Sequence, residues 1–404
     1  MKIVILTQYF LPEMGAPQNR LFELAKGLRA RGWKVKVVAA MPNYPTGKIF
    51  KDYQGKFFSA DQIEGIDVKR YWIYASNSAR ASPRIINMLS FSFTALFSAF
   101  FIRREKADFL MVESPPLTLA FSAWLISKFS GARMIMNVSD LWPLSAKELG
   151  AISEGMLYRS IEKLEHFLYR RADLCTGQSS EIVEYIKSRT TSPVYLFRNG
   201  VDTSRFIFDL HQQRPVGEPI RIVYAGLLGV AQGIFPLCEA IDFSKAGAEF
   251  HIYGTGFDKE RIEEFLKANP SRGIQYFGVI PRDNMPDIFK KYDATLVALV
   301  KNIYGAVPSK IYESMAAGLP IFFSGEGEGA RIVNENELGW VNQPGDWHTL
   351  IQNIAAYARK DQAGRDSLKH HCREVAVRKF DRAKQIDDFD SYLQAYVVKQ
   401  DASA

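Results

Sequence analysis

The sequence predicts an α/β protein of two doubly wound, Rossmann-like domains that face each other across a cleft. Length is the first reason, because 404 residues with 47% hydrophobic content can bury a large interior and suggest more than one domain. Apolar runs also alternate with helix-length periodic segments from end to end, as in parallel sheets with crossover helices. Finally, a polar stretch at 198–218, with Asn-Gly-Val-Asp at 199–202 and Gln-Gln-Arg-Pro at 212–215, marks the domain junction.

Apolar runs place the strands of the first domain, residues 1–200. Helices such as 17–31 and 156–171 separate the expected strands, which are 2–6, 34–39, 67–72, 109–112, 133–138 and 174–176. The opening apolar run is too short for a signal peptide and is not followed by a small-residue cleavage site. We therefore expect it to be a buried first strand.

The alternation restarts in the second domain, residues 201–385. Its expected strands are 221–224, 249–253, 274–277, 294–298 and 321–323. A last helix, 386–404, is expected to pack back on the first domain. Ligands of doubly wound sheets bind beyond the carboxyl ends of the strands, so we expect the chemistry in the cleft between the domains.

A lysine and a glutamate occupy the first turn of the helix expected after strand 294–298. Pro308 suits a helix entrance, Ser309 can cap the helix, and first-turn N–H groups without intrahelical partners favour an anion. Lys310 would add a mobile positive charge, and Glu313, one turn further on the same face, could accept two ribose hydroxyls. The segment therefore fits a nucleoside diphosphate, although the same pair could form an ion pair on the helix surface.

Residues 85–102 are free of charge over eighteen positions, roughly 27 Å of helix, and arginines flank both ends. Asn87, Ser90, Thr94 and Ser98 share one helical face, and the other faces carry mainly Leu, Met and Phe. An interfacial helix, a helix buried in the protein and a borderline membrane span all fit this pattern. We favour the interfacial helix, whose phenylalanines enter the lipid boundary while arginines meet acidic headgroups.

Charge and cysteine usage narrow the class of protein. The net charge of +7 favours an anionic partner, which could be a nucleotide, a nucleic acid or an anionic membrane. The three cysteines are far apart and form no paired ligand spacing, so we expect reduced thiols in a cytosolic protein and no structural zinc.

Four motifs, in order, resemble the nucleotide-sugar glycosyltransferases of the GT-B fold, in particular the retaining family 4. They are the Pro-Glu-Met-Gly-Ala at 12–16 with its following helix, the Arg-Asn-Gly-Val-Asp at 198–202, the glycine loop at 224–233, and 308–320. The Asp-Leu-Trp-Pro at 140–143 adds a likeness to bacterial transferases that build surface polysaccharides, such as O-antigen or capsule, on a polyprenyl diphosphate carrier.

The sequence also departs from the family pattern. Members often carry two glutamates eight positions apart, but here Gly305 stands at the first position and only Glu313 remains. Where many members have an Arg and a Lys in the second glycine loop, this chain has Leu228 and Gln232. The diphosphate charge is therefore expected to depend more on Lys310 and on backbone N–H groups that begin at Gly229.

The resemblance implies a role for each remaining candidate in the second domain. Lys310, beside Ser309, would stabilise the departing diphosphate without a bound metal, and Glu313 would hold the ribose. Backbone groups near Val279 and Ile280 would meet a uracil base. The sequence agrees with metal independence in having no tight Asp-x-Asp pair at a strand end, and no cofactor beyond the donor substrate is expected.

Two first-domain residues are further candidates. Asp140 follows strand 133–138 at its carboxyl side and could act in catalysis, or it could cap the next turn. Gly15 could bring backbone close to the donor or acceptor, or it could serve a tight turn between strand and helix.

The leading hypothesis is a retaining transferase that moves a hexose or N-acetylhexosamine from a UDP-sugar to a polyprenyl-diphosphate-linked saccharide. We expect it in the cytoplasm, peripherally associated with the inner face of the cell membrane. A sugar-nucleotide epimerase of the same fold is one alternative. A nucleic-acid-binding protein is the other, but positive residues alternate with acids along most helices and the chain has no aromatic-basic RNA-binding motif.

Overall fold

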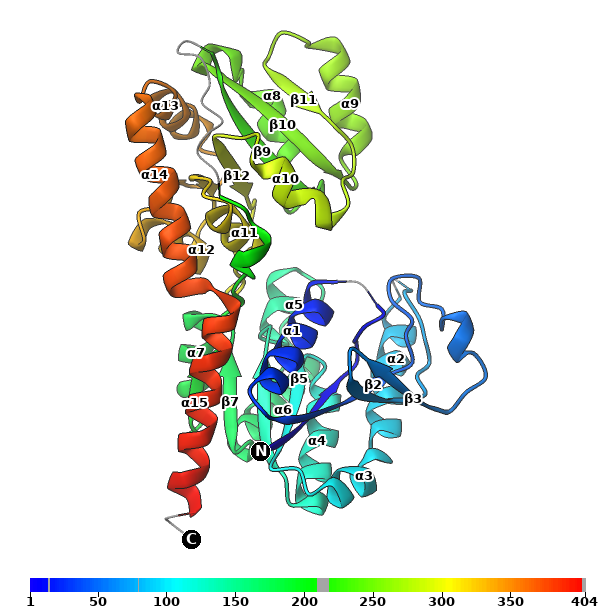
Figure 1. Cartoon of the computed structure of the whole chain (residues 1–404). Coiled ribbons are helices and arrows are strands. Elements are labelled where there is room, and N and C mark those ends of the chain that lie inside the picture. Colours follow the sequence, from blue (N-terminus) through cyan, green and yellow to red (C-terminus); the bar gives the residue numbers. More distant parts are fainter. Residues whose placement is uncertain (14, 79, 209–217, 402–404) are drawn as a thin grey trace. The chain divides into compact units, whose positions relative to one another are not determined.

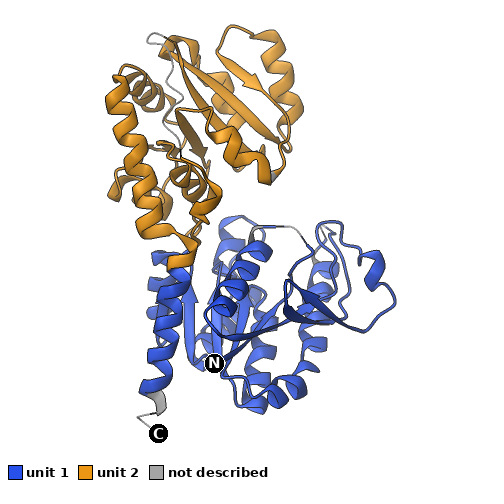
Figure 2. Cartoon of the chain, viewed as in Figure 1, with its two compact units in different colours: residues 1–198, 385–404 blue, residues 199–384 orange. Residues whose placement is uncertain are grey.

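The computed structural model describes residues 1–13, 15–78, 80–208 and 218–401. Two compact units make up the chain (Figure 2). Unit 1 contains Met1–Arg198 and Gln385–Ala404, and unit 2 contains Asn199–Lys384. The Gln-Gln-Arg-Pro at 212–215, expected in the junction, lies outside the described residues.

Unit 1 is built on an eight-stranded sheet in the order β3-β4-β2-β1-β5-β6-β7-β8 (Figure 1). The pairs are parallel except β3 with β4. The strands are β1 (Lys2–Thr7), β2 (Lys34–Ala40), β3 (Phe58–Ile63), β4 (Ile66–Tyr71), β5 (Phe109–Ser114), β6 (Arg133–Val138), β7 (Leu174–Gly177) and β8 (Val194–Leu196). Strand order reverses between β1 and β5, which makes their carboxyl ends the expected place for a ligand.

Helices cover both faces of this sheet. They are α1 (Ala16–Ala30), α2 (Ala81–Ala95), α3 (Ser98–Glu105), α4 (Leu117–Ser130), α5 (Leu144–Glu148), α6 (Met156–Arg171) and α7 (Ser180–Lys187). Alternate residues of β1, β2 and β5 share a core with α1, because side chains of period two point to one face. On another part of the sheet α2 packs on β2 and β4, and α4 packs on β5 and β6.

Unit 2 has a six-stranded parallel sheet in the order β11-β10-β9-β12-β13-β14. The strands are β9 (Ile220–Leu227), β10 (Ala248–Thr255), β11 (Ile274–Tyr276), β12 (Ala294–Ala298), β13 (Ile321–Ser324) and β14 (Gly339–Asn342). The helices are α8 (Ile234–Ala240), α9 (Lys259–Ala268), α10 (Met285–Phe289), α11 (Ser309–Ala316), α12 (Gly327–Glu335), α13 (Trp347–Ala358) and α14 (Gln362–Val375). Two buried clusters lie on opposite faces, and the order reverses between β9 and β12.

The last helix, α15 (Arg382–Asp401), belongs mostly to unit 1. Its buried residues Ile386, Phe389 and Leu393 complete the core that contains α1. The indole N–H of Trp33 donates to Asp390 at 2.7 Å, so a polar bond adds to the apolar contact. At the other end of α15, Val201 bonds to Phe380 and Arg382 within unit 2, where the two connecting segments run side by side.

The sequence analysis did not predict three of the strands, and one helix that it predicted is divided into two. The missed strands are β3, whose residues alternate between exposed and half-buried, and the short, incompletely buried β8 and β14. None of the three contains an apolar run of four residues or more, which explains the omission. The predicted helix at 85–102 is divided between α2 and α3, which meet at a bend of 42°.

Candidate functional site

Lys310 lies at the carboxyl end of the central strand β9. Its ammonium donates to the Tyr224 hydroxyl at 3.1 Å and stands 4.4 Å from the centre of the Tyr224 ring. Tyr224 is itself fully buried and donates to the Leu227 carbonyl oxygen. Burial lowers the pKa of Lys310 to about 8, and the nearby Glu313 carboxylate opposes that shift. A cation that is incompletely compensated in this way favours an anionic ligand.

Glycines allow this close approach. A Cβ atom at Gly226 would lie 2.4 Å from Lys310 Cε and 2.5 Å from its Nζ. On the neighbouring strand, a Cβ at Gly254 would lie 1.7 Å from the Gly226 carbonyl oxygen. Both glycines have positive φ values, 152° and 143°. The strand ends therefore require glycine both for backbone conformation and for space, and together they seat the lysine.

The first turn of α11 presents backbone N–H groups near the same place. Pro308 is the N-cap, in extended conformation, and no side chain caps the helix. The expectation that Ser309 caps α11 is therefore wrong, because Ser309 is already the first helical residue and its side chain is exposed. Lys310 and Glu313 follow on this helix as expected, and Gly318 has the left-handed φ of 70° that ends it.

The loop after β9 contains the two positions at which the sequence departs from the family cations. Leu228, where the family often has a cation, is fully buried in the core of unit 2 and cannot face a ligand. Gly229 and Gln232 form a turn, with the Gln232 N–H donating to the Gly229 carbonyl at 3.0 Å. The Gln232 Oε1 atom lies 2.8 Å from where a Gly229 Cβ would stand, so the amide folds back over this glycine.

Val279 and Ile280 lie beyond the carboxyl end of β11, on the same edge of the sheet. Gly254 donates to the Gly278 carbonyl at 2.8 Å, which ties this segment to β10 and, through Gly254, to Gly226. The Val279 side chain is 67% exposed. The structure thus gathers the second-domain candidates along the carboxyl ends of β9, β10 and β11 and the start of α11.

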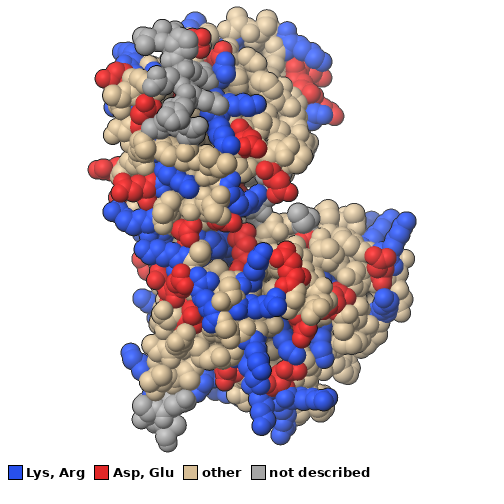
Figure 3. Space-filling view, in the orientation of Figure 1, with Lys and Arg blue, Asp and Glu red and all other residues tan. Residues whose placement is uncertain are grey.

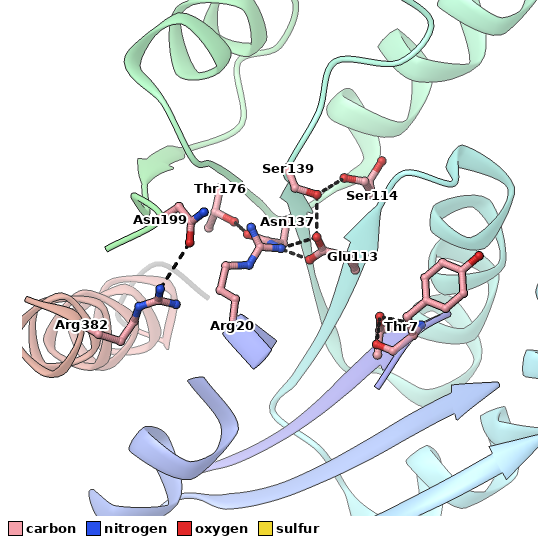
Figure 4. Close-up of polar contacts among 10 residues, drawn as sticks. Thr7, Arg20, Glu113, Ser114, Asn137, Ser139, Thr176, Asn199 and Arg382 are labelled. Atoms are coloured by element: carbon pink, nitrogen blue, oxygen red, sulfur yellow. Dashed lines mark hydrogen bonds and ion pairs between the residues drawn. The ribbon is translucent and has the colours of Figure 1, made fainter. Parts of the chain in front are cut away.

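Unit 1 contains a polar network that the sequence reading did not predict. Glu113, at the end of β5, accepts hydrogen bonds from Arg20 of α1, from Asn137 of β6 and, at 2.6 Å, from Ser139 (Figure 4). Thr176 of β7 donates to Asn137 at 2.6 Å. Glu113 therefore fixes α1 and the ends of β5 and β6 in place, and Asn137 extends the network to β7. The available signal was an acid that closes an otherwise apolar strand.

Gly15 is the N-cap of α1, with an extended φ of 176° that any residue can adopt. The alternative of a glycine-requiring tight turn is therefore wrong at this position. A Cβ there would meet the Gln18 side chain at 2.4 Å. Nearby, the buried Glu13 carboxylate accepts the N–H groups of Asn43 and Tyr44, both at 2.8 Å, and so fixes the loop before α1.

Asp140 follows β6, next to the network of Glu113 and Ser139. Its carboxylate accepts the Ser145 hydroxyl at 3.0 Å. Burial raises the pKa of Asp140, while the bonds from Ser145 and from the Leu141 N–H oppose the shift. The N-cap of α5 is Pro143, so Asp140 braces the first turn of that helix without being its cap residue.

Residues 15–196 match the family described as "Glycosyl transferase 4-like domain", and residues 207–376 match "Glycosyl transferases group 1". The chain belongs to the family 4 glycosyltransferases of the GT-B fold.

Two relatives of this chain are named as putative glycosyltransferases of colanic acid biosynthesis. The putative colanic acid biosynthesis glycosyl transferase WcaI of Escherichia coli K12 is 25% identical over 335 residues, which are 79% of this chain and 82% of that protein. The putative colanic acid biosynthesis glycosyltransferase WcaL of Salmonella typhimurium is 23% identical over 262 residues, 61% of this chain and 64% of that protein.

Solved structures share the fold at low identity. Sucrose-phosphate synthase of Thermosynechococcus elongatus has a TM-score of 0.71 at 16% identity, over 98% of this chain and 100% of that one. Anabaena HepE in complex with UDP has a TM-score of 0.69 at 15% identity, with the same coverage of 98% and 100%.

Proposed function

We propose that this glycosyltransferase is a retaining, metal-independent enzyme that moves a hexose or N-acetylhexosamine from a UDP-sugar to a polyprenyl-diphosphate-linked saccharide. Bacterial surface polysaccharide synthesis is the process we assign to it, since the relatives WcaI and WcaL are named for colanic acid biosynthesis. The observation that carries the donor proposal is the Lys310 ammonium, seated against Gly226 and Tyr224 at a strand end where ligands of this fold bind.

Each candidate of unit 2 has a role in this proposal. Lys310 and the first-turn N–H groups at Ser309 stabilise the negative charge that develops on the departing UDP. The backbone at Gly229 and the amide of Gln232 contact the same diphosphate. Glu313 accepts the ribose hydroxyls.

The backbone at Val279 and Ile280 contacts the uracil. The exposed Val279 side chain leaves room for a base. UDP and UDP-sugars are bound in structures of fold relatives, including HepE with UDP and with UDP-glucose.

Unit 1 contributes the acceptor side in this proposal. Gly15 and Asp140 lie near the carboxyl ends of its sheet, where the network around Glu113 fixes α1 and the strand ends. Asp140 orients the acceptor hydroxyl. In same-face attack, that hydroxyl oxygen bonds to the anomeric carbon as the bond from this carbon to the diphosphate oxygen breaks. The departing diphosphate oxygen receives the proton of the acceptor hydroxyl. Because attack and departure take place on the same face, the anomeric configuration is retained.

The lipid-linked acceptor and the peripheral position at the inner membrane face rest on the segment 85–102. The outer side chains of this segment, including Phe93 and Phe97, are exposed, so the alternative of a helix wholly inside the protein is wrong. Among the described residues, no single helix is long and apolar enough to cross a membrane. The α2–α3 pair reaches the required length and composition only together, across its bend.

A thermal-shift panel of UDP-, GDP- and dTDP-sugars tests the donor proposal. UDP compounds should raise the melting temperature of the wild type most, and Lys310→Met should lose most of that shift, because bound ligand stabilises only a protein that can bind it. Gly226→Ala should also reduce the shift, since its Cβ would displace the ammonium. Lys267→Met, an exposed residue of α9, is the matched control.

Equal UDP shifts in the wild type and in Lys310→Met would refute the role of the lysine. Conversion of UDP-GlcNAc in the absence of any acceptor would instead favour the epimerase, whose reaction needs none.

A further inference from the structure

Helix α2 is amphipathic with its polar side turned inward. The Asn87 amide donates to the Tyr74 carbonyl and accepts from Gln8, both at 2.7 Å. Thr94 donates to the Trp72 carbonyl at 2.6 Å, and Ser90 accepts the Tyr74 N–H at 2.9 Å. The polar face is therefore satisfied by unit 1 itself, and the apolar face remains on the outside.

The outward face of α2 and α3 is strongly apolar. Phe93 is 64% exposed and Phe100 is 72% exposed, and the other large exposed side chains here are Ile85, Ile86, Leu89 and Phe97. Side chains of this size are seldom exposed together on a surface that faces only water.

Helix α4, which the sequence reading did not single out, extends this face. Ser92 of α2 and Thr118 of α4 bond at 2.9 Å, and Ser122 donates to the Ser92 carbonyl at 2.8 Å, so the helices pack closely through small polar groups. At the outer side, the rings of Phe100 and Phe129 contact at 5.1 Å between centroids. Exposed residues of α4 recur at helical spacing, at Phe121, Leu125 and Phe129.

Positive charge surrounds this face, and the one acid of its three helices, Glu105 at the end of α3, is paired with Lys36 at 3.0 Å. Residues 80–104 and 117–130 contain Arg80, Arg84, Arg103, Arg104 and Lys128 but neither Asp nor Glu. The Arg103 guanidinium stands 5.0 Å from the Phe129 ring, which places a cation at the border of the apolar surface. Lys and Arg side chains are visible around the lower end of unit 1, where Figure 1 labels α3 (Figure 3).

We propose that α2, α3 and α4 together form one lipid-facing surface that lies on an anionic bilayer, with α4 contributing as a separate anchor. The inference rests on the membrane association in the proposed function and extends it from one segment to a surface of three helices. The phenylalanines enter the acyl boundary, and the five cations meet acidic headgroups. The inward hydrogen bonds of Asn87 and Thr94 keep this surface parallel to the bilayer as a part of unit 1.

Vesicle sedimentation of the full chain tests the surface, with phosphatidylcholine vesicles and with vesicles that also contain phosphatidylglycerol. The wild type should bind the anionic vesicles more tightly, and less so as salt rises. The α4 triple variant Phe121→Gln, Leu125→Gln and Phe129→Gln should bind them about tenfold more weakly or worse, since three large side chains lose their burial. Val398→Gln, at an exposed residue of α15, should bind as the wild type does.

A second variant, Ile86→Gln with Phe93→Gln on α2, distinguishes the interfacial segment 85–102 of the proposed function from the surface of three helices. If it loses vesicle binding while the α4 triple variant keeps it, the three-helix surface is wrong and the simpler interfacial segment stands. If neither variant changes vesicle binding, the lipid surface as a whole is wrong. A lipid-free dimer of the wild type that the α4 variant dissociates would assign the face to a second copy instead. An unchanged calorimetric transition of unit 1 in both variants confirms that they are folded.

Discussion

Burial of the Lys310 ammonium destabilises the free protein, and the same burial favours an anionic ligand. Its ammonium is removed from water beside Tyr224, and this lowers its pKa to about 8. An anion at the same place would restore the lost compensation and raise that pKa again. If Lys310 binds a diphosphate as we propose, the free energy of binding includes relief of a penalty already present in the folded chain.

UDP binding should therefore depend on pH. The ammonium is charged below about pH 8 and neutral above it, so affinity should fall as pH rises from about 7 to about 9.5, with the fall displaced above pH 8 because bound diphosphate favours the charged form. Titration calorimetry of UDP across this range measures the effect. Lys310→Met should bind weakly with little pH dependence, and a wild type equally insensitive to pH would contradict the assignment.

Residues of both units show which side-chain positions a local sequence pattern can and cannot predict. Asp140 was proposed because an acid follows an apolar strand, and Lys310 and Glu313 were proposed because they occupy the first turn of a helix after such a strand. Glu113 directly follows the expected strand 109–112 and carries the same signal, but it was not singled out, and the structure places it within β5. Leu228 was compared with a family cation by position, yet the turn of the backbone buries it. Direction of a side chain depends on neighbours that are remote in sequence.

At the scale of elements, α6 and α7 enclose a buried carboxylate that the proposed chemistry does not use. Glu165 of α6 accepts the hydroxyl of Tyr169 at 2.7 Å and that of Tyr185, on α7, at 3.1 Å. Burial raises its pKa to about 7, against the two hydrogen bonds. The raised pKa stabilises the fold most when Glu165 is protonated, below the ordinary carboxyl pKa, and that contribution is lost as pH rises through about 7.

Glu165→Gln should remove the pH dependence of this contact. Relative to the wild type, the variant should gain about 2–3 kcal/mol of unfolding free energy between about pH 5 and about pH 8, because an amide carries no charge to bury. Urea unfolding at both pH values measures the difference. Glu184→Gln, at an exposed position of α7, is the control and should show no such gain.

At the scale of the whole molecule, the chain passes between its units twice. Within unit 2 the two connecting segments are held together, since Arg382 donates to Gly200 and to Asn199, the latter at 3.3 Å (Figure 4). The Asn-Gly-Val-Asp motif thus supplies carbonyl and amide oxygens to the start of α15. From there α15 continues into the core of unit 1 with Phe389 fully buried.

Phe389→Ala should destabilise unit 1 selectively. Loss of a fully buried phenyl ring creates a cavity and typically costs about 3–5 kcal/mol. Calorimetry should show an earlier transition for unit 1, while the UDP-induced shift of unit 2 persists. Val398→Ala, at an exposed position of the same helix, should leave both transitions unchanged. A single cooperative loss of both units with UDP protection would contradict this independence.

The sequence by itself determined the α/β class, the buried strands and the position of the lysine at a helix start, because apolar periodicity and local helix chemistry depend on neighbours within a few residues. Only tertiary structure decided that Gly226 and Tyr224 seat the lysine, that Glu113 joins α1 to three strands, and that α4 shares an apolar face with α2 and α3. Those contacts join residues tens of positions apart, and their geometry is set by sheet order and packing, which no local pattern records.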